Sequence, residues 1–349
     1  MDNASPLLEV HDLSVLLQTH RGPAYAVRNV SFTLERGEAL GLIGESGCGK
    51  SITVMALLGL LPDNAKVTGS IRFEGEELVG RGERAMCAIR GNRIGMIFQE
   101  PMTALNPVHP IGRQVAEPLR LHRGMGSADA RKEAIRLLDR VGIPDAARRI
   151  DAYPHQFSGG QRQRITIAMA LACGPQLLIA DEPTTALDVT VQRQILELIR
   201  ELVAERGMAL LLISHDLGVI AQNVARMLVM YGGSVVESGP TGAVFAHRMH
   251  PYSLGLFAAR PGLRTAKGTR LATIAGSVPE LVDLPPGCPF AGRCRFTVSE
   301  CHVTVPPPYE VEPGHRVRCI RLDAVAAEAA QKDALTPALS QGEREEQPR

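Results

Sequence analysis

Apolar and polar residues alternate near the start of the chain, and short continuous apolar runs follow further on. Leu7–Val15 and Tyr25–Leu34 alternate with a period of two, which is typical of half-buried strands. Three later runs are almost wholly apolar: Ala39–Ile43, Leu177–Ala180 and Ala209–Ile213. Runs of this kind predict central strands of a parallel sheet, with functional side chains at their carboxyl ends.

Stretches with helical spacing separate these strands. The first, Lys50–Leu61, follows a glycine-rich turn, and the others cover Ala128–Val141, Gln161–Ala172 and Val189–Glu205. Strands that alternate with helices indicate an α/β fold.

The character of the chain changes near residue 250. Residues 1–250 form the main unit, and residues 251–322 are rich in Pro and Gly, so we expect an extension with little regular structure. Residues 323–349 are rich in Ala, Glu and Gln and have almost no large apolar side chains. This composition predicts a disordered tail.

Composition and charge narrow the class of protein. The 349 residues carry 38 basic and 37 acidic side chains, a net charge of +1, which argues against binding nucleic acid by bulk electrostatics. Aromatic residues are 4% and Trp is absent, so the core must be mostly aliphatic. The N-terminal segment lacks a basic stretch followed by an apolar run, and no apolar run approaches the ~20 residues of a membrane span. We therefore expect a soluble chain without a signal peptide.

Residues 44–51 read GESGCGKS and fit the pattern G-x-x-x-x-G-K-[ST]. The glycines let backbone N–H groups wrap a phosphate chain, and the following helix adds its positive N-terminal dipole. Lys50 is expected to reach the β- and γ-phosphates, and the Ser51 hydroxyl to ligate Mg²⁺. A chance glycine turn is the weaker interpretation, because the motif lies between an apolar strand and a helix. The residues expected to bind the nucleotide are Gly44, Glu45, Ser46, Gly47, Cys48, Gly49, Lys50, Ser51 and Ile52.

Two carboxylates follow the second apolar run, in the segment LLIADEP. Asp181 would hold Mg²⁺, directly or through water, and Glu182 would polarise the water that attacks the γ-phosphate. Taken alone, the pair is equally compatible with a solvated acidic turn, but the phosphate loop in the same chain favours catalysis.

A second anion-binding segment, FSGGQ, precedes another helix. Ser158 is expected to cap that helix, and the two glycines after it expose backbone N–H groups. One phosphate chain does not need two such sites on one subunit, but a dimer can use both.

At this point the chain resembles the ATP-binding subunits of ABC transporters, over residues 7–320. The resemblance is carried by six motifs in the family order: GESGCGKS, Gln99 in MIFQEP, FSGGQRQR, LLIADEP, Ala186-Leu187-Asp188 and Ser214-His215-Asp216. It implies a P-loop NTPase (RecA-like) core with an antiparallel β subdomain and a helical signature subdomain at about residues 100–170.

The resemblance also implies roles for individual residues. ATP would lie between two cassettes, bound by the phosphate loop of one and by the signature residues of the other. Glu182 would be the general base, His215 would contact the γ-phosphate, and Gln99 would touch Mg²⁺ and the attacking water. Asp188 would cross the dimer interface. The implied Mg²⁺ ligands are Ser51, Gln99 and Asp181, and the implied signature residues are Ser158, Gly159, Gly160 and Gln161.

Two positions depart from the pattern. Leu17 occupies the place where such families usually have an aromatic residue that stacks on adenine, and Tyr25 belongs to the next strand, so the base contact stays unassigned. Cys48 lies inside the cationic phosphate loop, which should lower its pKa. That leaves open either a redox-sensitive ATPase or, more simply, a tolerated small side chain.

Four cysteines are clustered in the extension with the spacing C-x5-C-x6-C-x17-C. Grouped thiolates in a reducing compartment suggest a metal site more than disulfides, and the absence of a close C-x2-C pair favours an iron–sulfur cluster over zinc. His302 and His315 are further candidate ligands, and four unligated thiols are the alternative. The candidate ligands are Cys288, Cys294, Cys301 and Cys319.

The extension resembles that of the oligopeptide/dipeptide importer branch, through His250-Pro251-Tyr252, LGLFAARP and PPGCPF followed by RC. Some members of that branch hold a [4Fe-4S] cluster on four such cysteines. The resemblance implies an ATPase that energises peptide import, placed peripherally on the cytoplasmic face of the inner membrane. The implied partners are two permease subunits, a second ATP-binding subunit (a related chain or a second copy) and an external substrate-binding protein, with no nucleic acid. The alternatives are an importer of nickel or another small solute, and a soluble ABC ATPase without a transport role.

Overall fold

The structure is a computed structural model that describes residues 5–185, 187–259 and 273–335. Within these ranges the main sheet has eight strands, in the order β11-β12-β10-β9-β3-β8-β7-β6. The five from β9 to β6 run parallel, and β10, β12 and β11 extend the sheet in antiparallel fashion. Their bounds are β3 Ala39–Ile43, β6 Ile94–Ile97, β7 Leu177–Asp181, β8 Ala209–Ser214, β9 Arg226–Tyr231, β10 Ser234–Pro240, β11 Tyr309–Glu312 and β12 His315–Val317.

A second, antiparallel sheet covers one face of the main sheet. Among the described residues it has four strands in the order β2-β1-β4-β5. Leu8 pairs with Leu34 on one side and Phe73 on the other, and all three side chains are buried. The strands are β1 Leu8–Thr19, β2 Gly22–Leu34, β4 Ala65–Phe73 and β5 Glu76–Glu77.

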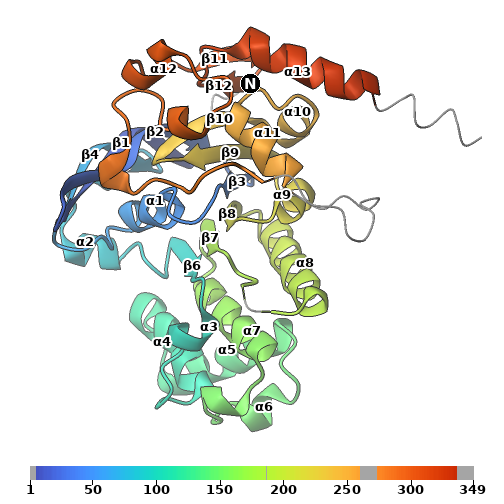
Figure 1. Ribbon diagram of the computed structural model, residues 1–349. Coiled ribbons are helices and arrows are strands. Elements are labelled where there is room, and N and C mark those ends of the chain that lie inside the picture. Colours follow the sequence, from blue (N-terminus) through green and yellow to red (C-terminus); the bar gives the residue numbers. More distant parts are fainter. Residues whose placement is uncertain (1–4, 186, 260–272, 336–349) are drawn as a thin grey trace, which may run out of the picture.

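Helices lie on both faces of the main sheet and form a separate lobe. Lys50–Leu57 and Glu83–Cys87 pack on the side of the small sheet, and the helices between residues 188 and 247 pack on the other side. The cassette helices are α1 Lys50–Leu57, α2 Glu83–Cys87, α3 Pro101–Ala104, α4 Ile111–Arg123, α5 Ser127–Arg140, α6 Ala146–Arg149, η1 Pro154–Gln156, α7 Gly159–Leu171, α8 Val189–Arg206, α9 Leu217–Asn223 and α10 Thr241–Ala246. In Figure 1 the two sheets lie in the upper part of the molecule, and α3 to α7 make up the lower lobe. None of the helices in the described part of the chain is long and apolar enough to cross a membrane.

The core is divided by the main sheet into two clusters. On β7, Leu178 and Ala180 point to the side of the helical lobe, whereas Leu177 and Ile179 point to the side of the small sheet. Alternation of side chains along a strand explains why this run is apolar throughout, since both of its faces are covered.

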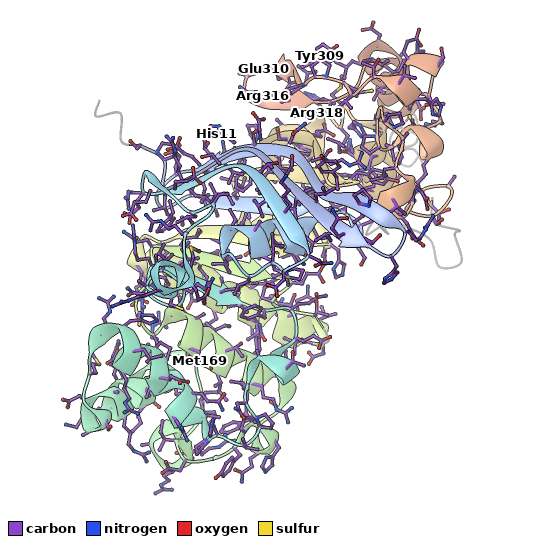
Figure 2. The ribbon with its side chains drawn as sticks, turned by 90° about the vertical axis from the view of Figure 1, so that its left-hand side faces the viewer. His11, Met169, Tyr309, Glu310, Arg316 and Arg318 are labelled. Atoms are coloured by element: carbon purple, nitrogen blue, oxygen red, sulfur yellow. The ribbon has the colours of Figure 1, made fainter. Side chains whose placement is uncertain are left out.

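The extension consists of short elements that wrap the top of the molecule in Figure 1. They are α11 Pro251–Ala258, η2 Leu281–Asp283, η3 Ala291–Arg293, α12 Ser299–Val303, β11, β12 and α13 Leu322–Leu335. Figure 2 shows Tyr309, Glu310 and Arg316 of the β11–β12 hairpin at the opposite end of the molecule from Met169 of α7.

The predicted strands and helices agree with the observed ones, with shifts of a few residues at their ends. The tail differs from the prediction, because α13 occupies residues 322–335. This segment is rich in Ala, the best helix former, and Val325 is fully buried. The rest of the predicted tail, residues 336–349, lies outside the described residues.

Candidate nucleotide site

The phosphate loop connects β3 to α1 and depends on glycine at two close approaches. Gly44 has φ 157, and a Cβ there would lie 2.3 Å from the carbonyl oxygen of Met230. Gly49 has φ 104, and a Cβ there would lie 2.5 Å from the carbonyl oxygen of Ala26. Neither position could accept a side chain without a shift of the neighbouring backbone, so the loop geometry requires both glycines.

Lys50 is buried beneath this loop. Its Nζ donates to the carbonyl oxygens of Gly44 at 2.8 Å and Glu45 at 3.1 Å. An ammonium group held inside an anion-binding loop is positioned to meet a phosphate chain.

Asp181, at the carboxyl end of β7, is the residue best suited to a cation. Its side chain is almost fully buried, and burial raises its pKa, although a hydrogen bond from Ser51 acts in the opposite direction. Its Oδ1 is buried without a hydrogen-bond partner among the described residues. An unpartnered carboxylate oxygen beside a serine hydroxyl fits Mg²⁺, which prefers oxygen ligands.

The three predicted catalytic residues converge on one oxygen atom. Oε2 of Glu182 lies 3.1 Å from Nδ1 of His215 and 3.3 Å from Nε2 of Gln99, and it accepts a hydrogen bond from the Thr185 hydroxyl at 3.1 Å. Thr185 was not among the predicted site residues. The backbone of Glu182 has φ 45, a left-handed conformation that costs energy for a residue other than glycine. The N–H of Glu182 donates to the carbonyl oxygen of Ile213 of β8 at 3.0 Å, which keeps the residue at the junction of β7 and β8.

The predicted signature segment lies at the start of α7, away from the phosphate loop of the same chain. Ser158 caps α7 as expected: its hydroxyl accepts from the N–H of Gln161 at 3.3 Å, and Gln161 Oε1 accepts from the N–H of Ser158 at 3.2 Å. A Cβ on Gly160 would lie 2.8 Å from Val191, so the start of α7 packs against the start of α8. In Figure 1 α7 belongs to the lower lobe and α1 to the upper part, so one chain does not bring the two segments together.

The start of α8 carries the predicted interface residue. Oδ1 of Asp188 caps the helix by accepting from the N–H groups of Thr190 and Val191. Its neighbour Ala186 lies outside the described residues.

The structure also places Cys48 and Leu17, the two positions that depart from the family pattern. Cys48 is buried, and burial raises its pKa despite the nearby Lys50, so the expectation of a lowered pKa is wrong. Leu17 pairs with Ala24, and Tyr25 is confirmed on β2, where it is half exposed and stands opposite Leu16.

The structure adds residues from the extension that sequence reasoning did not find. The hydroxyl of Tyr252 accepts from the N–H of Glu45 at 2.8 Å, and Arg293 Nη1 donates to Glu45 Oε2 at 2.8 Å. Both residues are more than 200 positions away from Glu45. They lie in the segments HPY and RC that carry the resemblance to the importer branch, but nothing in the sequence placed them at the phosphate loop.

The four cysteines of the extension line one small pocket together with His250 and Phe290. Burial raises the pKa of Cys288 to about 12 and of Cys294 to about 11, and the neighbouring thiols add to both shifts. Within the described ranges, no group of three or more His, Cys, Asp or Glu side chains is arranged to hold a single metal ion. The two histidines are not in this pocket: His302 is exposed, and Nε2 of His315 lies 2.8 Å from Glu237.

Comparison with known proteins follows the same division of the chain. Residues 27–185 match the family model described as ABC transporter, and residues 236–301 match the one described as oligopeptide/dipeptide transporter, C-terminal region. A Brucella melitensis protein with the provisional name peptide import ATP-binding protein is 50% identical over 334 residues, covering 92% of this chain and 99% of that protein. The oligopeptide transport ATP-binding protein OppD of Mycobacterium tuberculosis is 48% identical over 327 residues, which cover 93% of this chain and 53% of OppD.

Solved structures agree with the fold. The dimeric ATP-binding cassette MJ0796 bound to ADP and Pi is 28% identical with a TM-score of 0.61, covering 67% of this chain and 98% of that one. The protein cbiO1 from Clostridium perfringens, part of the transporter complex cbiONQ, is 27% identical with a TM-score of 0.59, covering 70% and 92% of the two chains.

Proposed function

Because this chain belongs to the family of ABC transporter ATP-binding proteins that carry the oligopeptide/dipeptide C-terminal region, we propose that it hydrolyses ATP to energise peptide import. One observation carries the proposal. Asp181 and Glu182 stand at the carboxyl end of β7, His215 follows β8, and the loop before Lys50 follows β3, and these three strands are neighbours in the main sheet. Ligands of open α/β sheets bind at this edge.

The ATP site would use the groups already in place. The glycine loop and Lys50 would hold the phosphates, and Ser51, Asp181 and Gln99 would hold Mg²⁺. The metal supplies charge neutralisation on the phosphate oxygens. Glu182 would take the proton of the attacking water, and His215, whose side chain is 66% exposed, would contact the γ-phosphate.

The second half of each ATP site would come from another cassette. Ser158, Gly159, Gly160 and Gln161 would face the nucleotide held by a second ATP-binding subunit, either a related chain or a copy of this one. Two permease subunits and an external substrate-binding protein would complete the importer. The chain would then be peripheral, on the cytoplasmic face of the membrane.

The four cysteines of the extension would hold a [4Fe-4S] cluster, with zinc as the alternative. Support comes from their convergence on one largely buried pocket, since each iron of a cluster needs a thiolate of its own. We expect anaerobically purified protein to be brown, with roughly four irons per chain and an absorbance shoulder near ~400 nm. Colourless protein with stoichiometric zinc would contradict the cluster and favour zinc.

The import function is tested by reconstitution. The chain is co-expressed with the permease and binding-protein genes that neighbour its own, and the complex is placed in vesicles. We expect peptides to stimulate ATP hydrolysis and nickel not to do so. Failure to co-purify with any permease would favour a non-transport ATPase, and stimulation by nickel alone would favour the other importer class.

A further inference from the structure

The four-cysteine extension and the phosphate loop meet at one side chain, Arg293. This residue ends η3 and immediately precedes Cys294. Its Nη1 donates to Glu45 Oε2 at 2.8 Å, and its Nη2 lies 3.4 Å from Glu45 Oε1. Both terminal nitrogens therefore face both oxygens of one carboxylate, the fork arrangement that gives arginine its geometric specificity.

Backbone carbonyl groups of the extension hold Arg293 in place. Its Nε donates to the carbonyl oxygen of Ala275 at 3.0 Å, and its Nη2 donates to that of Gly276 at 3.2 Å. The side chain is only 7% exposed. This pair is therefore not an ordinary surface ion pair, which contributes little.

The extension also holds the backbone of Glu45. The Tyr252 hydroxyl accepts from the Glu45 N–H at 2.8 Å. The ring of Tyr252 packs on Tyr231 at 4.7 Å between centroids, and Tyr231 packs on Phe290 at 5.0 Å. Phe290 lies between Cys288 and Cys294, so one aromatic cluster links the cysteine pocket to the first turn of the phosphate loop.

We propose that Arg293 is a positioning residue for the ATP site. It fixes Glu45, and through Glu45 the first turn of the phosphate loop, while the four-cysteine segment sets the place of Arg293 itself. The inference rests on the proposed ATPase function. It makes nucleotide affinity depend on a segment that is separated from the loop by 248 positions.

The test measures MgADP binding by isothermal titration calorimetry on the full chain, with Arg293→Met, Arg293→Lys and the control Arg295→Met. Arg295 lies two residues away and pairs with Glu328 of α13 instead of the phosphate loop. We expect roughly tenfold weaker binding for Arg293→Met, partial recovery in Arg293→Lys and no change in the control. In steady-state hydrolysis KM for ATP should rise by the same factor, with kcat changed less, because the contact is present in ground and transition states alike.

A double-mutant cycle shows whether the effect passes through Glu45. Glu45→Gln with Arg293→Met should bind no more weakly than Arg293→Met alone. Additive losses, an equal loss in Arg295→Met, or unchanged affinity in Arg293→Met would each overturn the inference. Wild-type chain that binds no MgADP would instead overturn the proposed ATPase function.

Discussion

Glu182 combines a strained backbone with a carboxylate oxygen that three side chains approach. Gln99 and Thr185 donate hydrogen bonds to it, and Nδ1 of His215 lies 3.1 Å away. These contacts fix the orientation of the carboxylate but leave it accessible to solvent, since its side chain is 14% exposed. In the proposed ATPase, a carboxylate held in this way would take the proton of the attacking water.

Replacing Glu182 by Gln should remove hydrolysis and keep binding. The amide is isosteric but cannot take a proton, so we expect kcat to fall by more than about 100-fold while MgATP affinity stays unchanged. Phosphate release and MgATP binding measure the two quantities. Glu197→Gln, at an exposed carboxylate of α8 paired with Arg200, is the matched control and should leave both unchanged. Undiminished phosphate release in Glu182→Gln would assign the base elsewhere.

Burial decides the reactivity of Cys48. Its side chain is 1% exposed and burial raises its pKa, whereas Cys87 is exposed at the end of α2. The pKa of Cys87 is raised as well, by its hydrogen bond with Glu83, so access decides between the two thiols. Iodoacetamide should label Cys87 in the native protein and leave Cys48 unmodified until unfolding. Peptide mass spectrometry reads both sites, and ATPase activity should be retained. Labelling of Cys48 at the rate of Cys87, with loss of activity, would restore the redox-sensitive interpretation.

A buried carboxylate joins the extension to the cassette. Glu237 of β10 is 1% exposed and accepts from the N–H groups of Met249 at 2.8 Å and His250 at 3.1 Å. Its Oε1 also lies 2.8 Å from Nε2 of His315, which is fully buried on β12. The carboxylate thus ties the added strand and the start of α11 to the main sheet.

Glu237→Gln should destabilise the protein. The amide cannot satisfy two backbone N–H groups and a histidine at once, so we expect a loss of about 3 kcal/mol in the free energy of unfolding. Chemical denaturation, followed by circular dichroism, measures it. The control is Glu310→Gln on the exposed hairpin labelled in Figure 2. Its Oε1 accepts from the N–H of Gly314 at 2.8 Å, a bond that the amide oxygen can keep, and only the 4.0 Å ion pair with Arg316 is lost, so the destabilisation should stay below about 1 kcal/mol. Equal effects of the two substitutions would mean that the buried pair has no special role.

Sequence periodicity predicted the bounds of strands that are buried on both faces and of amphipathic helices well. The run Ala39–Ile43 matches β3 residue for residue, because a central parallel strand must be apolar on both faces. Other elements could not be read in this way. The strands β11 and β12 contain four and three residues and depend on backbone pairing, of β12 with β10 and of β11 with β12, rather than on a pattern of their own. Helix α13 has few large apolar residues, and tertiary contacts such as that of Arg295 with Glu328 hold it.

The candidate site divides into a part that strand ends predict and a part that only tertiary packing creates. The phosphate loop, Asp181, Glu182 and His215 follow buried strands, so strand ends alone indicated that they would meet. Arg293 and Glu45 are 248 positions apart, and only the docking of the extension on the cassette brings them together. The sequence carries no pattern for such a contact because it arises from tertiary packing.

The position of the signature segment predicts an ATP site shared between two cassettes, because one chain does not place this segment at its own phosphate loop. Ser158 is exposed at the start of α7, in the lower lobe of Figure 1, while α1 lies above. With the Glu182→Gln variant, which retains nucleotide, we expect MgATP to drive association with a second cassette, either a copy of this chain or a related subunit. Light scattering on the chain alone, and mixed with that subunit, measures the mass.

Ser158→Arg should abolish association, because the guanidinium would occupy the space of the phosphate bound by the partner, whereas Ser127→Arg at the exposed start of α5 should not. A monomer that hydrolyses ATP at full rate, or normal association of Ser158→Arg, would contradict a site shared between two cassettes.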